Sequence, residues 1–333
     1  MLQTEQPVAS IRALMDGLID YAGLFPPAEL SMEQAIQTYA TYRLSPDAWM
    51  INTFVVPANR LSELADHSGH FYTNPPYRFT ITGRGGTAMG DFLSGSDKDL
   101  MDARRFLEIH GDYVRIERYE VRLPEDVLEG VSSRRMGDIL AGVVDRLESS
   151  LQAQPRIFIE ASWRKNWRQR FNALISELSR LNRDRDLDNA LGFKLRCGGT
   201  TAGDVPPSDF VAGAIYSAAR SHLPMKFTAG LHHPLRQYRD NFGIDMHGFI
   251  NVFVAGALVH TLKLDEFQIR DIIDERDLDA FHLDETEVGW RELRISIADF
   301  RKARSEFVIG YGSCSFDEPR SNLQSMGILP GKM

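Results

Sequence analysis

Residues 191–228 read LGFKLRCGGTTAGDVPPSDFVAGAIYSAARSHLPMKFT and hold two strand-like runs on either side of one helix-like run. The runs Leu191–Arg196 and Pro224–Thr228 are short and rich in apolar and aromatic residues, as is typical of buried strands. Between them, apolar residues recur at three- and four-residue steps, on one face of a helix: Phe210, Val211, Ala214, Ile215 and Ala218. A strand, a helix and a second strand in this order form the right-handed crossover of a parallel sheet. The stretch therefore predicts an α/β fold with its helices outside the sheet.

The same alternation continues along most of the chain. Four more strands are expected at Met50–Val56, Tyr77–Thr82, Tyr113–Leu123 and Arg156–Glu160. Helices are expected at 32–43, opened by a capping box of Ser31 and Gln34, and around the periodic apolar sets of 136–147 and 167–181. Six strands with no Gly-rich phosphate loop after the first favour a (β/α)8-like barrel of parallel strands with outer helices over a doubly wound open sheet.

The last third of the chain is expected to be irregular. Phe249–Val259 fits a buried helix as well as a strand, so the positions of the seventh and eighth strands stay open. The segment 264–307 is expected to be a helical tail that serves as a lid or as the surface of a homo-oligomer. No repeat or linker divides residues 1–333, and barrels of this type reach this length as one unit, so we expect a single domain.

Composition and charge narrow the class of protein. Apolar residues make up 43% of the chain, which supplies a large core, and the net charge of −8 is spread along the sequence. No strong basic patch favours nucleic acid or an anionic membrane, and the basic stretch 156–185 is interpreted as a solvated helix face. The start of the chain has no secretory pattern, no apolar run reaches ~18 residues, and only Cys197 and Cys314 occur. These features predict a cytoplasmic protein.

Candidate catalytic residues lie where predicted strands end, because active sites of parallel barrels lie at the carboxyl ends of their strands. Lys194 and Arg196 share one face of their strand, and Lys226 and Thr228 share one face of the next. Two neighbouring lysines can lower each other's pKa, which frees an amine to attack a carbonyl as a Schiff-base enzyme requires. The alternative is that these lysines pair with acids such as Glu160 and are structural.

At these residues, over about 191–230, the sequence resembles the class I aldolases of the deoxyribose-phosphate aldolase type. That family carries a Schiff-base lysine on one strand and a second lysine on the next. The resemblance implies that Lys194 forms the Schiff base and that Lys226 lowers its pKa. Two features depart from the family: its proton-relay aspartate has no assigned counterpart on an earlier strand, and Leu231-His232-His233-Pro234 replaces its Gly-rich phosphate-binding ending.

Histidines give a second candidate site. His232 or His233, together with His247 and Glu160, is a candidate ligand set for a divalent metal that polarises a carbonyl or activates water. The same histidines also suit acid/base work beside a reactive lysine, because imidazole titrates near neutrality. Asp20, in the segment Ile19–Pro27, is a further acid/base or binding candidate.

The leading hypothesis is an aldolase-like lyase that acts on a small anionic carbonyl compound without a cofactor. Its catalytic residues are Lys194, Lys226, Glu160 and His232, and its substrate-binding residues are Arg196, Thr228, His233, Asn251 and Asp20. One alternative is a metal-dependent hydrolase or isomerase that uses His232, His247 and Glu160. The other is a barrel that binds a small molecule without chemistry.

Overall fold

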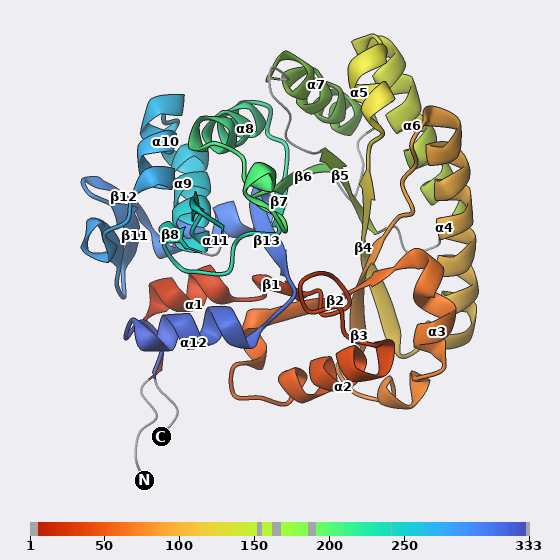
Figure 1. The fold of residues 1–333 in the computed structure, drawn as a ribbon, viewed down its shortest axis with the longest axis horizontal. Coiled ribbons are helices and arrows are strands. Elements are labelled where there is room, and N and C mark those ends of the chain that lie inside the picture. Colours follow the sequence, from red (N-terminus) through yellow and green to blue (C-terminus); the bar gives the residue numbers. More distant parts are fainter. Residues whose placement is uncertain (1–5, 152–154, 162–167, 186–190, 241, 331–333) are drawn as a thin grey trace.

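Eight parallel strands close into a barrel in the computed structural model, which describes residues 6–151, 155–161, 168–185, 191–240 and 242–330 (Figure 1). The strands are β1 (Ile19–Tyr21), β2 (Ile51–Pro57), β3 (Tyr77–Thr82), β4 (Val114–Arg122), β5 (Arg156–Ala161), β6 (Gly192–Arg196), β7 (Met225–Thr228) and β13 (Val308–Ser313). Their order is β1-β13-β7-β6-β5-β4-β3-β2, with β2 pairing back to β1. The (β/α)8-like prediction is confirmed, and the open sheet is excluded.

Helices surround this barrel on the outside (Figure 1). They are α1 (Ala9–Met15), α2 (Met32–Arg43), α3 (Leu61–Ala65), α4 (Met89–His110), α5 (Glu125–Gly130), α6 (Ser133–Ser150), α7 (Arg168–Arg185), α8 (Ser208–Arg220), α9 (Phe249–Leu262), α10 (Glu266–Asp274), α11 (Ile297–Glu306) and α12 (Asp317–Ser325). The capping box of α2 is confirmed, with the Ser31 hydroxyl accepting from the Gln34 main chain at 3.2 Å. Trp167, expected in α7, lies outside the described residues. Within the described ranges, none of the helices has both the length and the apolar composition for a membrane crossing.

The two strands that the sequence left open are β1 and β13. β1 has only three residues, and β13 is separated from β7 by the whole segment 229–307. The ambiguous run Phe249–Val259 belongs to helix α9, and every residue of that run is buried. A helix that is buried all round has no polar face, so its periodicity does not distinguish it from a strand.

The insertion between β7 and β13 builds a separate layer beside the barrel. It contains the hairpin β8 (Gln237–Arg239) and β9 (Ile244–Met246), helices α9 to α11, and an antiparallel sheet of β10 (Phe281–Leu283), β11 (Glu287–Trp290) and β12 (Leu293–Ser296). The prediction that 264–307 is helical throughout is therefore wrong, because this three-stranded sheet lies between α10 and α11. Its role as a lid or oligomer surface stays a prediction.

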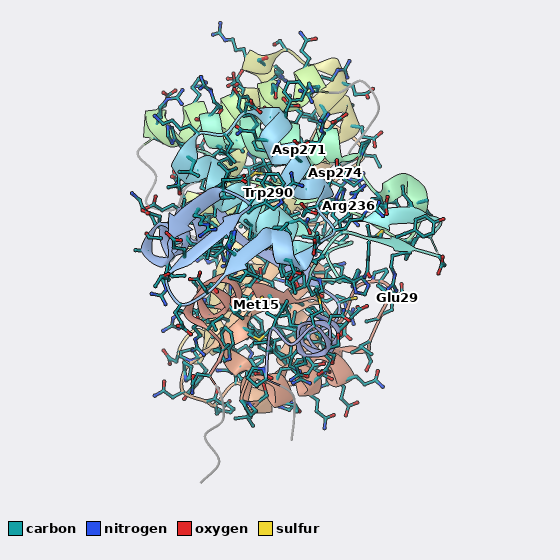
Figure 2. The ribbon with its side chains drawn as sticks, turned by 90° about the vertical axis from the view of Figure 1, so that its left-hand side faces the viewer. Met15, Glu29, Arg236, Asp271, Asp274 and Trp290 are labelled. Atoms are coloured by element: carbon teal, nitrogen blue, oxygen red, sulfur yellow. The ribbon has the colours of Figure 1, made fainter. Side chains whose placement is uncertain are left out.

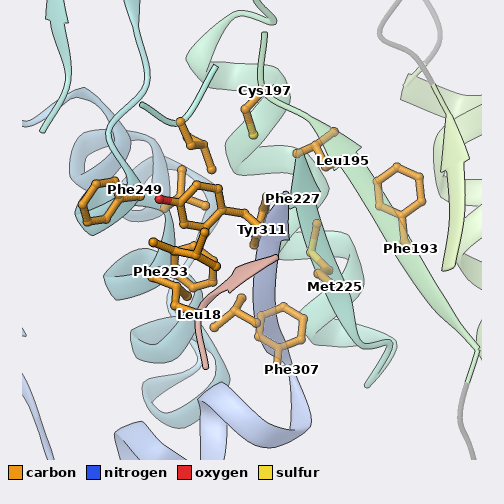
Figure 3. Packing of buried hydrophobic residues seen from close by; sticks show 14 of the residues in the cluster. Leu18, Phe193, Leu195, Cys197, Met225, Phe227, Phe249, Phe253, Phe307 and Tyr311 are labelled. Carbon is orange, nitrogen blue, oxygen red and sulfur yellow. The ribbon is translucent and has the colours of Figure 1, made fainter. Parts of the chain in front are cut away.

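Apolar packing outside the barrel fixes this layer. Figure 3 shows the rings of α9 against β7 and β13: Phe253 meets Phe227 edge-on at 5.3 Å, and Phe249 stacks on Tyr311 at 5.9 Å between ring centroids. Burying one large apolar side chain stabilises a fold by roughly 1.5–3 kcal/mol, so these contacts hold α9 firmly. Because successive strand residues alternate in direction, the inner faces of the same strands carry a different set of side chains.

Candidate active site

Charged and hydroxyl side chains from seven strands meet inside the barrel. They are Asp20 on β1, Thr53 on β2, Thr80 on β3, Arg118 and Glu120 on β4, Glu160 on β5, Lys194 on β6 and Lys226 on β7, and each is at most 9% exposed. The strand register places Glu160 beside Lys194, and Lys194 beside Lys226. Barrels of this type are usually filled by layers of branched apolar residues. A buried charged interior is therefore a candidate site rather than ordinary packing.

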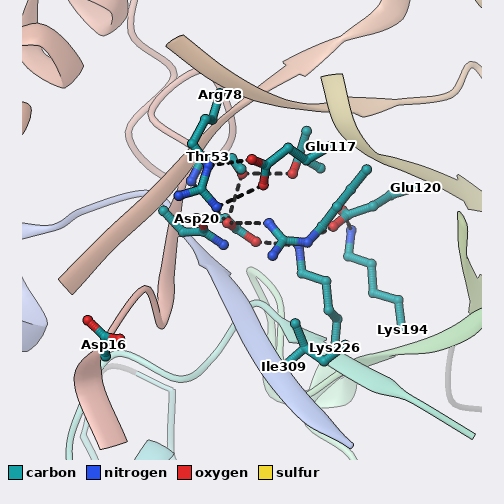
Figure 4. Close-up of polar contacts among 12 residues, drawn as sticks. Asp16, Asp20, Thr53, Arg78, Glu117, Glu120, Lys194, Lys226 and Ile309 are labelled. Atoms are coloured by element: carbon teal, nitrogen blue, oxygen red, sulfur yellow. Dashed lines mark hydrogen bonds and ion pairs between the residues drawn. The ribbon is translucent and has the colours of Figure 1, made fainter. Parts of the chain in front are cut away.

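Glu120 is the centre of this interior because it joins the two lysines. Lys194 Nζ lies 2.7 Å from one oxygen of Glu120 and 2.9 Å from Glu160. Lys226 makes ion pairs with the other oxygen of Glu120 and with Asp20, as Figure 4 shows. Each lysine is thus held between two carboxylates, and Glu120 belongs to both sets.

Asp20 extends the network to the first strands of the barrel. It lies in β1, and it accepts hydrogen bonds from the Thr53 hydroxyl at 2.7 Å and from Arg118 at 3.1 Å. The Thr53 and Thr80 hydroxyls are 2.7 Å apart. Every buried charge in this network has an opposite partner, as the cost of burying ions requires.

The carboxylates of the network are ionised at neutral pH. Burial raises the pKa of Asp20, but Arg118 and Lys226 outweigh it and bring that pKa down to about 2. The pKa of Glu160 also falls to about 2, since the cations beside it outweigh its burial. The pKa of Glu120 is lowered in the same way.

The pKa of Lys194 moves in the direction opposite to our expectation. Burial lowers it, but Glu120 and Glu160 outweigh burial, and the pKa rises above the ordinary lysine value. The predicted lowering by Lys226 is wrong because Glu120 lies between the two ammonium groups and pairs with both. Lys194 is therefore an ammonium group in the resting protein.

A cavity of about 650 Å³ opens above this network at the carboxyl ends of the strands. Its lining includes Glu120, Glu160, Lys194, Arg196, Thr228 and His232, with parts of 22–27, 199–204 and 312–314. Lys194 contributes to this lining, whereas Lys226 does not and is only 1% exposed. Asp20 also lies below the lining. Of the two lysines, Lys194 is the one that a ligand in this cavity meets.

The mouth of the cavity carries two further cations. Arg196 reaches Glu160 with one nitrogen, at 3.2 Å, while its side chain remains 36% exposed. Arg122, at the end of β4, also lines the cavity and is 50% exposed. Arg196 uses one nitrogen on Glu160, and Arg122 makes only a long, exposed pair with Glu125 at 3.8 Å, so both guanidinium groups keep donors for a carboxylate or phosphate.

Glycines let the ends of β6 and β7 approach each other. A Cβ on Gly230 would lie 2.7 Å from the carbonyl oxygen of Cys197, and one on Gly198 would lie 2.8 Å from the Cα of Gly230. Gly230 also has a φ of +75°, in the left-handed region that favours glycine. Larger residues would separate the two strand ends that carry Arg196 and Thr228.

The three histidines lie in different surroundings. His232 lines the cavity, and its Nδ1 is 3.0 Å from Glu318 on α12. His233 is outside the lining, and the Asn322 amide donates to its Nδ1 at 2.9 Å. Of the neighbouring pair, His232 therefore lies in the wall of the cavity, and His233, which we expected to bind substrate, lies outside its lining.

His247 is a buried structural residue. Its Nε2 donates to the Pro206 carbonyl at 2.8 Å, and its Nδ1 accepts from Arg236 at 3.1 Å. Arg236 also pairs with Asp274 at 3.3 Å, and Figure 2 shows these two residues close together. With both ring nitrogens occupied, His247 does not join His232 and Glu160, and no cluster of three metal-binding side chains occurs among the described residues. The metal ligand set that we considered is not assembled.

Asn251 also has a structural role in place of the substrate contact that we expected. It is fully buried on α9, where its oxygen accepts from the main chain of Arg236 at 3.0 Å. Its amide donates to the carbonyls of Ile272 and Glu275 at 2.8 and 2.7 Å. The side chain ties α9 to the end of α10 and lies outside the lining of the cavity.

Arg118 and Glu120 are the charged members of the buried network that the sequence analysis did not single out. They are two positions apart within the predicted strand Tyr113–Leu123, so they share one face of it. An acid and a base on one face of a strand in a parallel sheet are unusual, since such strands are buried on both sides. That pattern is the signal that could have identified them from the sequence.

The buried His247 predicts a pH dependence of stability. Burial lowers its pKa to about 4, below the ordinary value of ~6.5, so protonation favours the unfolded chain. Its contribution is complete above pH ~6.5 and is lost as the pH falls toward 4, by at most about 3 kcal/mol. We expect the free energy of unfolding in urea to depend much less on pH between 4 and 6.5 in His247→Gln than in the parent. The control His67→Gln, after α3, should keep the pH dependence of the parent. An unchanged pH dependence in His247→Gln would contradict this assignment.

Comparisons with known proteins add little to this geometry. No family model matches the chain, and no curated protein matches it. Among solved structures, the apo form of a putative deoxyribose-phosphate aldolase from Toxoplasma gondii ME49 is similar with 10% identity and a TM-score of 0.40, over 95% of this chain and 98% of that one. The endoglucanase CEL6B from Humicola insolens is similar with 9% identity and a TM-score of 0.35, over 70% and 81%. These likenesses are distant, and the barrel assignment rests on the strand order described above.

Proposed function

We propose that this chain is an aldolase-like lyase that acts on a small anionic carbonyl compound through an imine at Lys194. The observation that carries the proposal is the position of Lys194, which lines the cavity with its Nζ between Glu120 and Glu160. Imine formation needs a group that takes a proton from the ammonium ion and a group that later takes one from the bound nitrogen, and the two carboxylates beside Lys194 can serve as these groups.

Imine formation starts with the loss of a proton from Lys194. A ligand that fills the cavity removes water from it, and desolvation disfavours both members of the ion pair, so the proton passes to Glu120 or Glu160. The neutral amine attacks the carbonyl carbon, and the protonated carboxyl returns its proton to the oxygen, which becomes a hydroxyl. The other carboxylate beside Lys194 then carries a proton from the bound nitrogen to this hydroxyl, which leaves as water and gives the iminium. A carboxylate at the site takes the proton of the hydroxyl on the carbon beyond the breaking bond, so that this fragment leaves as a carbonyl compound. The iminium accepts the electron pair of the broken carbon–carbon bond and becomes an enamine, which is then protonated and hydrolysed to free Lys194.

The other site residues have supporting roles in this proposal. Lys226 shares Glu120 and so weakens the hold of that carboxylate on Lys194. Arg196 binds the carboxylate or phosphate of the substrate, with Thr228 beside it in the cavity lining. His232, hydrogen-bonded to Glu318, moves protons at the cavity wall.

The charge of the site supports an anionic substrate. The network and the cavity lining together hold five cations and four acids, which leaves one positive charge in excess. The cations are Arg118, Arg122, Lys194, Arg196 and Lys226, and the acids are Asp20, Glu120, Glu160 and Asp204. The same excess suits a barrel that only binds an anion, so binding alone does not separate this alternative from the lyase. A covalent test does.

Reductive trapping is that test. We expect borohydride, added with short aldehydes and ketones that carry a carboxylate or phosphate, to fix a secondary amine on the peptide containing Lys194, as located by mass spectrometry. Because the pKa of Lys194 is raised, the yield should rise by up to about tenfold per pH unit above pH 7, without a plateau below pH 10. Labelling confined to surface lysines such as Lys98 and Lys302 would remove the lyase and leave the binding barrel.

A further inference from the structure

A second cavity, of about 930 Å³, lies at the opposite end of the barrel. Its lining includes residues at or just before the amino-terminal ends of four strands: Gly17, Asn52, Pro76 and Ile309. Barrel enzymes carry their chemistry at the other end, so a large cavity here is not part of the site around Lys194. Figure 4 shows Asp16, which also lines this cavity, set apart from the network of Asp20 and Lys226.

Arginines dominate this amino-terminal cavity. Its lining holds Arg12, Arg43, Arg78, Arg301 and Arg304 against one acid, Asp16. Arg78 is neutralised by a bidentate pair with Glu117. The other four arginines form no ion pair with any acid in the described part of the chain. The cavity therefore has a strong positive charge that the protein itself does not balance.

Arg304 shows this lack of balance most clearly because it is buried. Its guanidinium donates to main-chain carbonyls, those of Leu14 at 3.1 Å, Ile309 at 2.6 Å and Asp16 at 3.3 Å among them. Burial lowers the pKa of this guanidinium group to about 9, well below the ordinary arginine value. The carboxylates of Asp16 and Asp20 offset this cost only in part, and an anion in the cavity would supply a closer counter-ion.

Two further groups are held ready for a ligand. Arg12 stacks over the ring of Trp49 at 4.1 Å, and its guanidinium makes no hydrogen bond within the described residues. The ring fixes the plane of the guanidinium and leaves its donors open. Asn52 is only 7% exposed, lines the cavity, and has no hydrogen-bond partner for its side-chain amide in the same described part of the chain. Its amide atoms are not sealed from solvent, so they can reach a ligand in the cavity.

We propose that the amino-terminal cavity binds a small polyanion, a phosphate ester or a polycarboxylate. Arg12 and Arg301 contact its charged oxygens, Asn52 donates to it, and Arg304 supplies charge from below. Planar guanidinium groups recognise phosphate and carboxylate oxygens in pairs, which suits a ligand with two or more negative charges. The volume is within the range of small-molecule sites, ~300–1,000 Å³.

Calorimetric titration of the full chain with pyrophosphate and with citrate, at constant ionic strength, tests this proposal. We expect saturable binding of at least one probe, weakened about tenfold or more by Arg301→Gln and by Arg12→Gln, since each removes charged hydrogen bonds. Arg301 is exposed and makes no ion pair or hydrogen bond in the described residues, so its substitution keeps the fold. Arg105→Gln, on the exposed face of α4, is the matched control and should bind as the parent does.

Arg196→Gln separates the two cavities, because Arg196 belongs to the carboxyl-terminal one. Binding that survives Arg196→Gln and falls in the Arg12 and Arg301 variants supports the proposal. Binding that falls in Arg196→Gln and persists in the other two would overturn it. Affinity weaker than about 1 mM for both probes would overturn it as well.

Discussion

Lys194→Met will abolish borohydride trapping and lower carbon–carbon cleavage by at least about 10³-fold, because it removes the only group proposed to bond covalently to the substrate. Methionine replaces the lysine chain up to Cε and removes the amine, but it leaves Glu120 and Glu160 without a cation that they both contact. Lys194→Arg is therefore the second variant: it keeps the positive charge and loses the amine, since a guanidinium stays protonated. Both variants should be inactive, and the arginine variant should be the more stable of the two.

Two controls define the result for Lys194. Lys98→Met, on the exposed face of α4, should trap and react as the parent does. Lys226→Met should retain a trappable amine but with a lower yield at a given pH, because Glu120 then pairs with Lys194 alone and raises its pKa further. Trapping that persists in Lys194→Arg and is lost in Lys226→Met would show that Lys226 forms the imine, and it would overturn the proposal.

The barrel was largely predictable because its first strands alternate with single amphipathic helices. A strand followed by one helix and another strand allows few topologies, so six strands could be placed from short apolar runs between periodic helices. The sequence also indicated that Lys194 and Lys226 share a face, because alternation along each strand is a local property. The last strand, β13, could not be placed, because it contains two glycines and follows an insertion with its own sheet.

The charge state of the site was not predictable, because it depends on contacts between residues far apart in the sequence. Lys226 meets Asp20 and Glu120 only once the barrel has closed and brought β1, β4 and β7 around one interior. The sequence correctly predicted that Lys194 and Lys226 lie on adjacent strands, but the predicted lowering of the pKa of Lys194 had the wrong sign. The decisive distance, 2.7 Å between Lys194 and Glu120, is a tertiary feature. For the same reason, Asn251 and His247 were assigned to the site although the packing of the insertion occupies both.

Glu120→Gln will be the most destabilising substitution at the site and should lower the free energy of unfolding by about 3–5 kcal/mol. Each buried lysine then keeps one carboxylate partner and loses Glu120, which both lysines share. Glutamine has the same shape, so the loss reports charge rather than packing. Urea unfolding at pH 7 measures it, and Glu108→Gln is the matched control, since its pair with Arg104 is exposed and contributes about 0.5 kcal/mol or less.

The same variant also tests how Glu120 sets the pKa of Lys194. With Glu120 neutral, one of the two carboxylates that raise this pKa is gone while burial still lowers it. The amine should then be freed at lower pH, so trapping at pH 7 should rise in Glu120→Gln even as the protein becomes less stable, whereas cleavage should fall with the loss of a proton acceptor. Equal stability in Glu120→Gln and Glu108→Gln, or a pH profile of trapping that does not move, would show that Glu120 is not the residue that couples the two lysines.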